Sequence, residues 1–468
     1  MKPVEIQITI VSGGKLAVSI DYHTGVSPVV RRWLSDEATV EAISRDLDEL
    51  VEDALSRPGT EKEAAEQRQD TDERLRSLGL ALFQEILRHE CDHLKSLVPD
   101  EDTYLLFKID GALAYVPFEM LYDGEEFLSH RFAMARAIYT EDAQAPKDAE
   151  KAPPYRVVVL GDPSEDPSIS RDVEEEIDAI KGVLKQSKEF SLRIATGSEV
   201  DMKFILSALP GSTVFHFSGH GEVSADEGHT GIRLKNGDVL SGMALRGLQD
   251  PPTIAFFNMC AAASREAWRG SLGLIETLLR RGTKACVASL WDLRSKSATL
   301  LASRLYEYLL RNETFGHALR KARLDVAHAF GTHDPTWAAY TLYGDPQLTL
   351  IPSGKASRAI AGRGSRLAAF CALLILVTFI LFPTETHRHE PGIQDQVILG
   401  YLLLESTPED ATILIDGTEV GMTPFTAEVT VGDHRVTIEK QGYKQWEAWV
   451  EVKETPRAVI QAYLEKIE

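Results

Sequence analysis

The chain has 468 residues, of which 44% are hydrophobic and 26% are charged, and a chain of this size forms about three domains. This balance excludes a disordered chain, a collagen-like repeat and a polytopic membrane protein. The formal net charge of −21 disfavours binding to nucleic acid, because acidic surfaces repel phosphates. The four scattered cysteines are too few for a disulfide framework and indicate a reducing compartment.

Two kinds of pattern follow one another in the first three quarters of the chain. Apolar alternation predicts two short strands before residue 21, with Gly13-Gly14 at the turn, followed by acid-rich helices. From Arg156 onward, continuous apolar runs alternate with amphipathic segments, which predicts a mostly parallel sheet covered on both faces. We therefore expect an α+β subdomain in residues 1–150 and an α/β subdomain in residues 151–352.

One uncharged apolar run follows, from Leu367 to Phe382. As a helix it would be roughly 24 Å long, slightly shorter than the ~30 Å hydrocarbon core of a bilayer. The linker 353–366 before it carries four basic residues and no acid. A transmembrane helix over residues 367–383 is therefore predicted, although a buried core helix is an alternative for so short a run.

The charges around this run predict its orientation. By the positive-inside rule, residues 1–366 are cytoplasmic and residues 384–468 are extracytoplasmic, so the chain crosses the inner or cytoplasmic membrane once. After a linker over residues 384–397, short alternating strands fill residues 398–468, with turns at pairs such as Asp416-Gly417. This pattern predicts a small β-sandwich.

Two predicted strands of the α/β subdomain end in reactive residues. STVFHFSGHG reaches His220-Gly221, and PTIAFFNMC reaches Cys260. Parallel strands present their carboxyl ends at one edge of a sheet, so both residues are expected at the same rim. A thiol there can attack a peptide carbonyl while an imidazole protonates the leaving amine and backbone N–H groups hold the oxyanion. From spacing alone, both residues could instead belong to the core.

The order of several motifs resembles the CHAT family of caspase-like peptidases. These motifs run from roughly residue 100 to residue 350 and are VPFEMLYDGEEFL, VVLGDP, FHFSGHG, FFNMC, ASLWDL and WAAYTLYGDP. The resemblance implies a caspase-like α/β fold with a six-stranded, mostly parallel sheet between helices and the N-terminal subdomain packed on it. It also implies that His220 is the general acid/base, that Cys260 is the nucleophile and that the backbone of Gly221 and Cys260 forms the oxyanion hole, with no cofactor or metal.

Asp292, in SLWDL, resembles part of the WDV segment of separases, relatives that cleave after arginine. A carboxylate in a pocket favours a basic side chain, so Asp292 and Trp291 are predicted to form a specificity pocket. The chain departs from the separase pattern at Ser295, where a second acid would follow. Asp292 could instead cap the helix that begins near Ser295, or be solvated.

Other candidate residues receive simpler interpretations. His216, within the strand that ends at His220, is predicted to be a packed or hydrogen-bonded core histidine, and Cys286 to be a small buried residue. His89-Glu90-x-x-His93 has the zincin spacing and resembles the metal helix of peptide deformylases. Because the further cysteine ligand and the AAPQ-type loop of those enzymes are missing, a zinc enzyme is only a remote alternative.

The C-terminal residues resemble a PEGA domain. TPEDATILIDG, GMTPF, VGDHRVTIEKQGY and WEAWVEV carry the resemblance, including Pro408, Gly421, His434 and Tyr443. Members of that family are small extracytoplasmic β-domains attached to varied cytoplasmic enzymes. The resemblance implies a tether or a sensor whose partner is an extracytoplasmic ligand.

Together these features predict a membrane-anchored bacterial cysteine endopeptidase that cleaves a protein substrate in regulated stress or defence proteolysis. The main alternative is a scaffold that retains the caspase fold without cleaving. Both positions of the predicted dyad are occupied, which favours the enzyme. An intact dyad does not establish turnover, however, since substrate loops can stay closed until a trigger arrives.

Overall fold

The computed structural model describes most of the chain outside the predicted membrane region. The described residues are 4–22, 31–55, 61–87, 94–95, 97, 103–138, 152–162, 165–166, 169–222, 231–234, 238–260, 265–293, 295–351, 399–408, 411–423, 425–430, 432–452, 458–464 and 466. They fall into two compact units, Met1–Arg363 and Gly364–Glu468.

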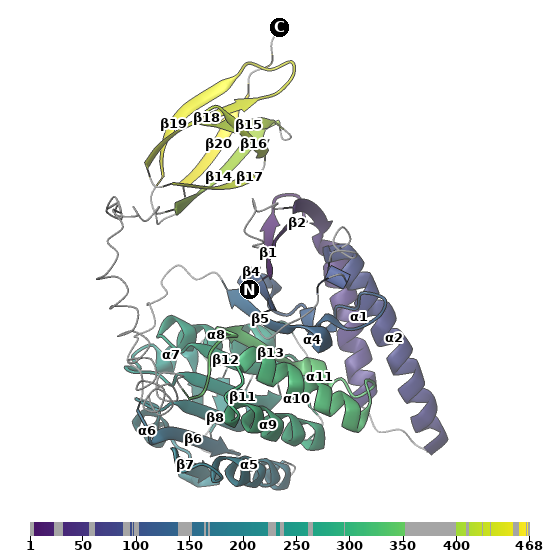
Figure 1. The fold of residues 1–468 in the computed structure, drawn as a ribbon, viewed down its shortest axis with the longest axis vertical. Helices are drawn as coiled ribbons and strands as arrows, with labels where there is room; N and C mark the ends of the chain where they lie inside the picture. Colours follow the sequence, from purple (N-terminus) through teal and green to yellow (C-terminus); the bar gives the residue numbers. More distant parts are fainter. Residues whose placement is uncertain are drawn as a thin grey trace, which may run out of the picture. The chain divides into compact units, whose positions relative to one another are not determined.

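The first half of the larger unit contains strands and a helical hairpin. Strands β1 and β2 are antiparallel, and their turn places Gly13 and Gly14 at φ of 75° and 68°, which glycine adopts without strain. This confirms the predicted hairpin. Helices α1 and α2 pack side by side (Figure 1). The elements are β1 (Val4–Val11), β2 (Lys15–Asp21), β3 (Arg31–Asp36), α1 (Glu37–Leu55), α2 (Glu61–Leu87), β4 (Tyr104–Ile109), α4 (Leu128–Arg131) and β5 (Ala133–Ile138).

The second half of this unit alternates strands with helices, as the apolar runs predicted. The strands are β6 (Tyr155–Gly161), β7 (Phe190–Thr196), β8 (Val214–Glu222), β9 (Gly231–Arg233), β10 (Val239–Ser241), β11 (Ile254–Cys260), β12 (Ala285–Ser289) and β13 (Tyr340–Gly344). The helices are α5 (Ser170–Leu184), α6 (Met202–Ala208), α7 (Gly242–Leu245), α8 (Arg265–Arg280), α9 (Ser295–Leu310), α10 (Phe315–Phe330) and α11 (Thr336–Ala339).

The expected six-stranded arrangement is present, but it is part of a larger sheet. Strands β7, β6, β8, β11 and β12 are parallel in that spatial order, and β13 is antiparallel to β12. The order continues through β5, β4, β1, β2 and β3, and β9 and β10 extend from β8, giving a 13-stranded sheet. The N-terminal strands therefore continue the sheet beyond β13, whereas we expected their subdomain to be packed on a six-stranded sheet.

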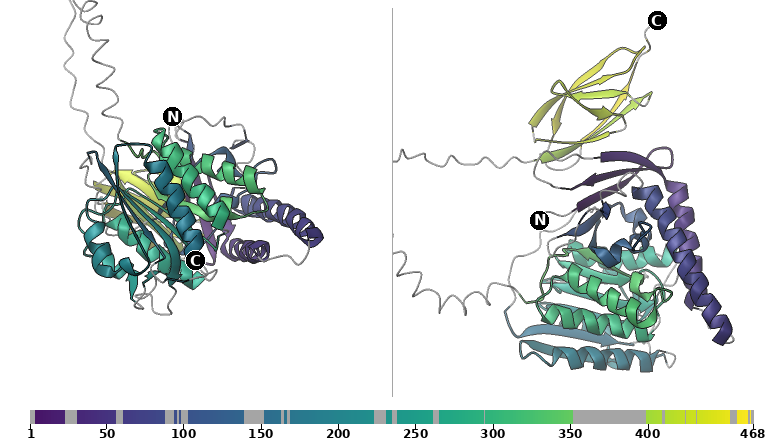
Figure 2. Two further views of the ribbon diagram at one scale, coloured as in Figure 1. Left: turned by 90° about the horizontal axis from the view of Figure 1, so that it is seen from below. Right: turned by 45° about the vertical axis from the view of Figure 1, so that its right-hand side comes forward.

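Helices cover this sheet and explain why its strands are apolar. Helices α5, α9 and α10 lie side by side over one face, whereas α8 contacts β9, β10 and β12 (Figure 2). All five residues of β12 are buried, including Cys286 as predicted. A strand that is buried on both faces has no solvent side, so its residues form a continuous apolar run.

The junction between the two halves contains a buried ion pair. Arg136 of β5, whose Cα pairs with that of Tyr343 of β13, donates to the carbonyl of Ala114 at 2.7 Å. Its guanidinium also forms an ion pair with Glu119, and both side chains are almost fully buried. Glu119 belongs to the VPFEM motif, so part of that motif stabilises the continuous sheet.

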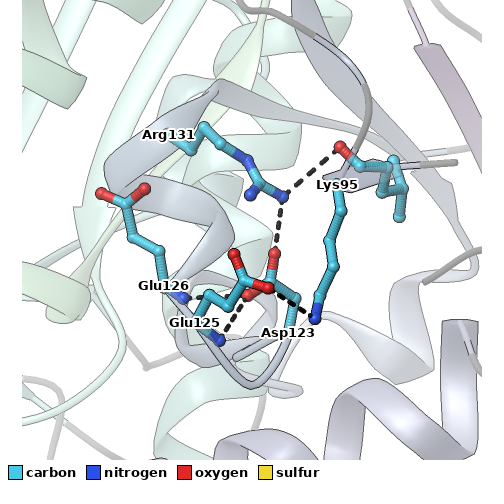
Figure 3. A network of polar contacts seen from close by, with 6 residues as sticks. Lys95, Asp123, Glu125, Glu126 and Arg131 are labelled. Carbon is cyan, nitrogen blue, oxygen red and sulfur yellow. Dashed lines mark hydrogen bonds and ion pairs between the residues drawn. The ribbon is translucent and has the colours of Figure 1, made fainter. Parts of the chain in front are cut away.

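The turn that follows this motif contains a second polar network (Figure 3). The Asp123 carboxylate accepts the backbone N–H groups of Glu125 and Glu126 at 2.9 and 2.8 Å and pairs with Arg131 at 2.7 Å. Lys95 pairs with the exposed Glu125 at 3.1 Å. Burial alone would raise the pKa of Asp123, but the N–H groups of Glu126 and Glu125 and the Arg131 charge hold that pKa below its usual value.

The smaller unit is a two-sheet β-sandwich, as predicted. One sheet has the order β17-β14-β20 and the other β16-β15-β18-β19, and the two share one apolar core. The strands are β14 (Leu399–Thr407), β15 (Thr412–Ile415), β16 (Thr418–Met422), β17 (Phe425–Thr430), β18 (Gly432–Glu439), β19 (Trp446–Val452) and β20 (Ala458–Tyr463). Asp416 and Gly417, predicted at a turn, have φ of 51° and 79°.

The predicted transmembrane helix over residues 367–383 lies outside the described residues. Among the helices that the structure does describe, none combines the length and the apolar character needed to cross a membrane.

Replacing Asp123 by asparagine should destabilise the larger unit. The substitution leaves the Arg131 guanidinium without its carboxylate, which lowers the free energy of unfolding by about 3 kcal/mol. Because the pKa of Asp123 is lowered on folding, its contribution is present above about pH 4 and is lost as pH falls through the folded pKa. Urea unfolding of the full chain at pH 7 and pH 3 measures both effects.

The matched control is Glu125→Gln, which removes only the exposed partner of Lys95. It should cost less than about 1 kcal/mol. Equal destabilisation by the two substitutions, or a cost of Asp123→Asn that grows toward pH 3, would contradict this account.

Candidate active site

The two residues predicted to form the dyad lie opposite each other on adjacent strands. Strands β8 and β11 are parallel and in register over seven residue pairs, and the last pair is His220 with Cys260. Both residues lie at the carboxyl ends of their strands, where this type of sheet places its chemistry. The structure describes the backbone of Cys260 but not its thiol, so the dyad itself stays a prediction.

Residue alternation places His220 on the helix-covered face of β8 that also carries His216 and Ser218. His216 is fully buried, and its Nδ1 and Nε2 lie 3.1 Å from the Tyr306 hydroxyl and from Glu176 Oε1. Its ring stacks on Phe256 with centroids 4.8 Å apart. These contacts confirm the predicted core histidine.

A carboxylate contacts the imidazole of His220, and sequence reasoning missed it. Asp166 Oδ2 lies 3.1 Å from His220 Nε2, and both side chains are partly exposed, by 39% and 27%. Asp166 follows β6, the other neighbour of β8 in the sheet. From sequence, VVLGDP counts only as a motif of the family resemblance, yet the acid Asp166 comes just after a strand that reaches the same sheet edge.

The turn that carries Asp166 is held against β8. The backbone N–H of Asp162 donates to the carbonyl of Ser218 at 2.9 Å, and the Ser170 hydroxyl donates to the Asp166 carbonyl at 2.8 Å. Gly219 permits this approach, because its φ is 157° and a Cβ there would lie 3.3 Å from the Asp162 nitrogen.

The end of β11 is fixed from its other side. The Ser289 hydroxyl, from β12, donates to the carbonyl of Met259 at 2.6 Å. In a trans peptide the N–H points away from the C=O, so this bond sets the direction of the Cys260 N–H. Gly221, the other expected oxyanion donor, continues β8, and its Cα pairs with that of Ile232 in β9.

The residues expected to form a specificity pocket follow β12. Trp291 is 4% exposed, and its indole Nε1 hydrogen-bonds to none of the groups that the structure describes. Asp292 is exposed. Ser295, which stands where separases carry a second acid, begins α9 and donates to Asp172 of α5 at 2.6 Å. Whether Trp291 and Asp292 bind substrate stays a prediction.

The remaining candidates separate into two groups. His89, Glu90 and His93 lie outside the described residues, and the part of the chain that is described contains no cluster of three metal-ligating side chains. The preceding helix, α2, buries an amphipathic face that contains Leu82, Phe83, Ile86 and Leu87.

Burial raises the pKa of the Cys286 thiol, so this cysteine is not a nucleophile at neutral pH.

Comparison with solved structures shows the fold. The chain resembles separase from Saccharomyces cerevisiae, solved with securin, with a TM-score of 0.52 and 13% sequence identity over 74% of this chain and 30% of that chain. It also resembles the Arg-specific cysteine proteinase gingipain R of Porphyromonas gingivalis, with a TM-score of 0.42 and 14% identity over 88% of this chain and 96% of that one.

Comparison with protein families identifies both units. No curated protein matches the chain. Residues 399–468 match the PEGA domain, which confirms the resemblance that their motifs indicated. Residues 72–345, more than half of the chain, match the CHAT domain, and the protein therefore belongs to the CHAT domain family.

Proposed function

We propose that this protein is a cysteine endopeptidase in which Cys260 is the nucleophile and His220 the general acid/base. The observation that carries the proposal is the register of β8 and β11, which pairs these two residues at the carboxyl end of the sheet. Paired residues of parallel strands project to the same face. A caspase-like protease fold, in a member of the CHAT domain family, supports the same assignment.

The proposed reaction has two halves. His220 accepts the thiol proton of Cys260, and the sulfur attacks the carbonyl carbon of the scissile peptide. The C–N bond breaks, and His220 gives this proton to the departing amine. Water then attacks the thioester and gives a proton to His220, the C–S bond breaks, and His220 returns the proton to the sulfur, which regenerates the thiol. The N–H groups of Gly221 and Cys260 stabilise the oxyanion in both halves.

Asp166 has a positioning role in this proposal. Its contact with Nε2 holds one edge of the imidazole and directs the other ring nitrogen, Nδ1, toward the reacting groups. Asp292 would favour a basic residue in the substrate, with Trp291 as a wall of the pocket.

The finer statements about location and role also belong to this proposal. The uncharged run Leu367–Phe382 and its basic flank support a single-pass anchor in the cytoplasmic membrane, with the peptidase in the cytoplasm. The PEGA domain would then lie outside and bind an extracytoplasmic ligand. The substrate is a protein, and the resemblance to the CHAT family suggests that the role is regulated stress or defence proteolysis.

Full-length protein in native membranes should react covalently with a peptidyl acyloxymethyl ketone. Cys260→Ala should abolish the labelling, whereas Cys286→Ala, which removes a fully buried thiol, should leave it intact. Labelled peptides are identified by mass spectrometry. Absence of Cys260-dependent labelling under every activating condition, with partner binding retained in Cys260→Ala, would instead favour the catalytically silent scaffold.

Asp166→Asn should lower kcat by about tenfold or more with little change in KM, because it disturbs proton transfer without removing a substrate contact. The matched control is Asp178→Asn, an exposed carboxylate of α5 that pairs with Lys181. Steady-state hydrolysis of a fluorogenic peptide measures both variants. Equal kcat values for wild type and Asp166→Asn would remove Asp166 from the proposal.

Membrane topology can be tested with single cysteines in a cysteine-free chain. A cysteine introduced in the PEGA domain, as in Thr418→Cys, should react with a membrane-impermeant maleimide in intact cells, whereas Ser187→Cys should react only after lysis. Thr418, the first residue of β16, is exposed, and Ser187, between α5 and β7, is partly exposed. Labelling of both positions, or of neither, in intact cells would contradict the proposed orientation.

A further inference from the structure

A buried carboxylate contacts β8 and β11 two residues before the candidate dyad. Glu176 of α5 is 3% exposed, and its carboxylate contacts three described side chains that can donate a hydrogen bond. Its Oε2 accepts from Ser218 Oγ at 2.7 Å and from Asn258 Nδ2 at 2.5 Å, and its Oε1 lies 3.1 Å from His216 Nε2.

The position of these donors in the sheet links Glu176 to the dyad. Ser218 and Asn258 are register partners on β8 and β11, two residues before His220 and Cys260 on the same strands. One carboxylate therefore bridges the two strands two pairs before the dyad, at the last pair on the same face of the sheet. Two residues of a strand span roughly 7 Å. The Glu176 carboxylate therefore lies about this far from the dyad positions at the ends of β8 and β11.

A second layer of hydroxyl groups completes the network. The Tyr340 hydroxyl of β13 donates to Asn258 Oδ1 at 2.9 Å, and the Tyr306 hydroxyl of α9 lies 3.1 Å from His216 Nδ1. The titratable groups that face Glu176 are thus His216 directly and, one hydrogen bond further, these two tyrosines. Burial and the charge of Glu176 both raise the pKa of Tyr306.

A network of this kind is costly to retain for stability alone. Buried charges are expensive to desolvate, and apolar residues of similar volume often fill a core equally well. A fully satisfied polar network instead fixes one geometry, because each member has a single set of partners. Here the geometry that it fixes is the relative position of β8 and β11.

We propose that Glu176 is a positioning residue of the active site, which locks the ends of β8 and β11 together and sets the electrostatic potential around the Cys260 thiol. This inference rests on the proposed function, since it assigns the dyad to His220 and Cys260. A negative charge at this distance opposes formation of the thiolate. Glu176 therefore raises the pH at which the Cys260 thiol loses its proton.

The test measures the rate at which iodoacetamide alkylates Cys260 in the full chain as a function of pH, with each cysteine followed separately by mass spectrometry. Glu176→Gln should shift the Cys260 profile to lower pH by roughly one unit, as expected for loss of a unit charge at about 7 Å. Glu119→Gln, which removes a buried carboxylate far from the dyad in the sequence, is the matched control and should leave the profile in place. Thermal unfolding confirms that each variant is folded.

A second variant tests the inference if Glu176→Gln does not fold. The exchange Glu176→Gln with Asn258→Asp retains a buried amide–carboxylate pair but moves the charge onto β11. The profile should then lie at or above that of the wild type. A Glu176→Gln profile that superposes on the wild type, an equal shift in Glu119→Gln, or a profile of the exchanged pair below the wild type would each overturn the inference.

The two proposals fail in different ways. Alkylation by iodoacetamide needs a thiolate but no peptidase activity, so the profile is measurable even if the protein is a scaffold. Loss of Cys260-dependent labelling by the peptidyl ketone, with the profile shift retained, would refute the peptidase and not the electrostatic role of Glu176. Labelling that persists in a Glu176→Gln variant with an unshifted profile would refute only the role of Glu176.

Discussion

The parallel pairing of β8 with β11 is the constraint on which the candidate site depends. It joins two segments forty residues apart and brings His220 opposite Cys260 at the end of the ladder. A slip of one residue would move every side chain of one strand to the other face and would separate the pair. The register is fixed by apolar side chains on one face, where Phe215 and Phe257 meet edge to face, and by the Glu176 network on the other.

The neighbouring strands β6 and β12 each help to hold one residue of this pair in place. Strand β6 leads into the turn that carries Asp166 to the imidazole, and β12 carries Ser289, which holds the peptide group before Cys260. Behind them, β13 pairs with β12 on one side and β5 on the other, and the N-terminal strands extend the sheet from there. The candidate site lies at the carboxyl ends of strands inside this large sheet. Its residues are therefore held by rigid elements, which favours chemistry that needs a fixed geometry.

Sequence alone predicted the parts of the site that are local. The apolar runs before His220 and Cys260 identified two buried strands, and the glycines identified the turns, because both signals lie within about ten residues. Asp166 and Glu176 were missed, since their contacts join residues 54 and 82 apart in sequence, and a carboxylate on a helix looks the same whether it faces solvent or a strand. The extent of the sheet was also missed, because nothing in the sequence of β13 predicts that β5 pairs with its free side.

The proposed chemistry requires the thiol of Cys260 and the imidazole of His220 to face each other across the β8–β11 pair. A crystal structure of the full chain, or of its covalent adduct with a peptidyl ketone, measures this directly. The account predicts that Cys260 Sγ lies within about 4 Å of the His220 ring or of a substrate carbonyl between them. Side chains on opposite faces of the sheet, or a thiol enclosed in the core away from the imidazole, would contradict it.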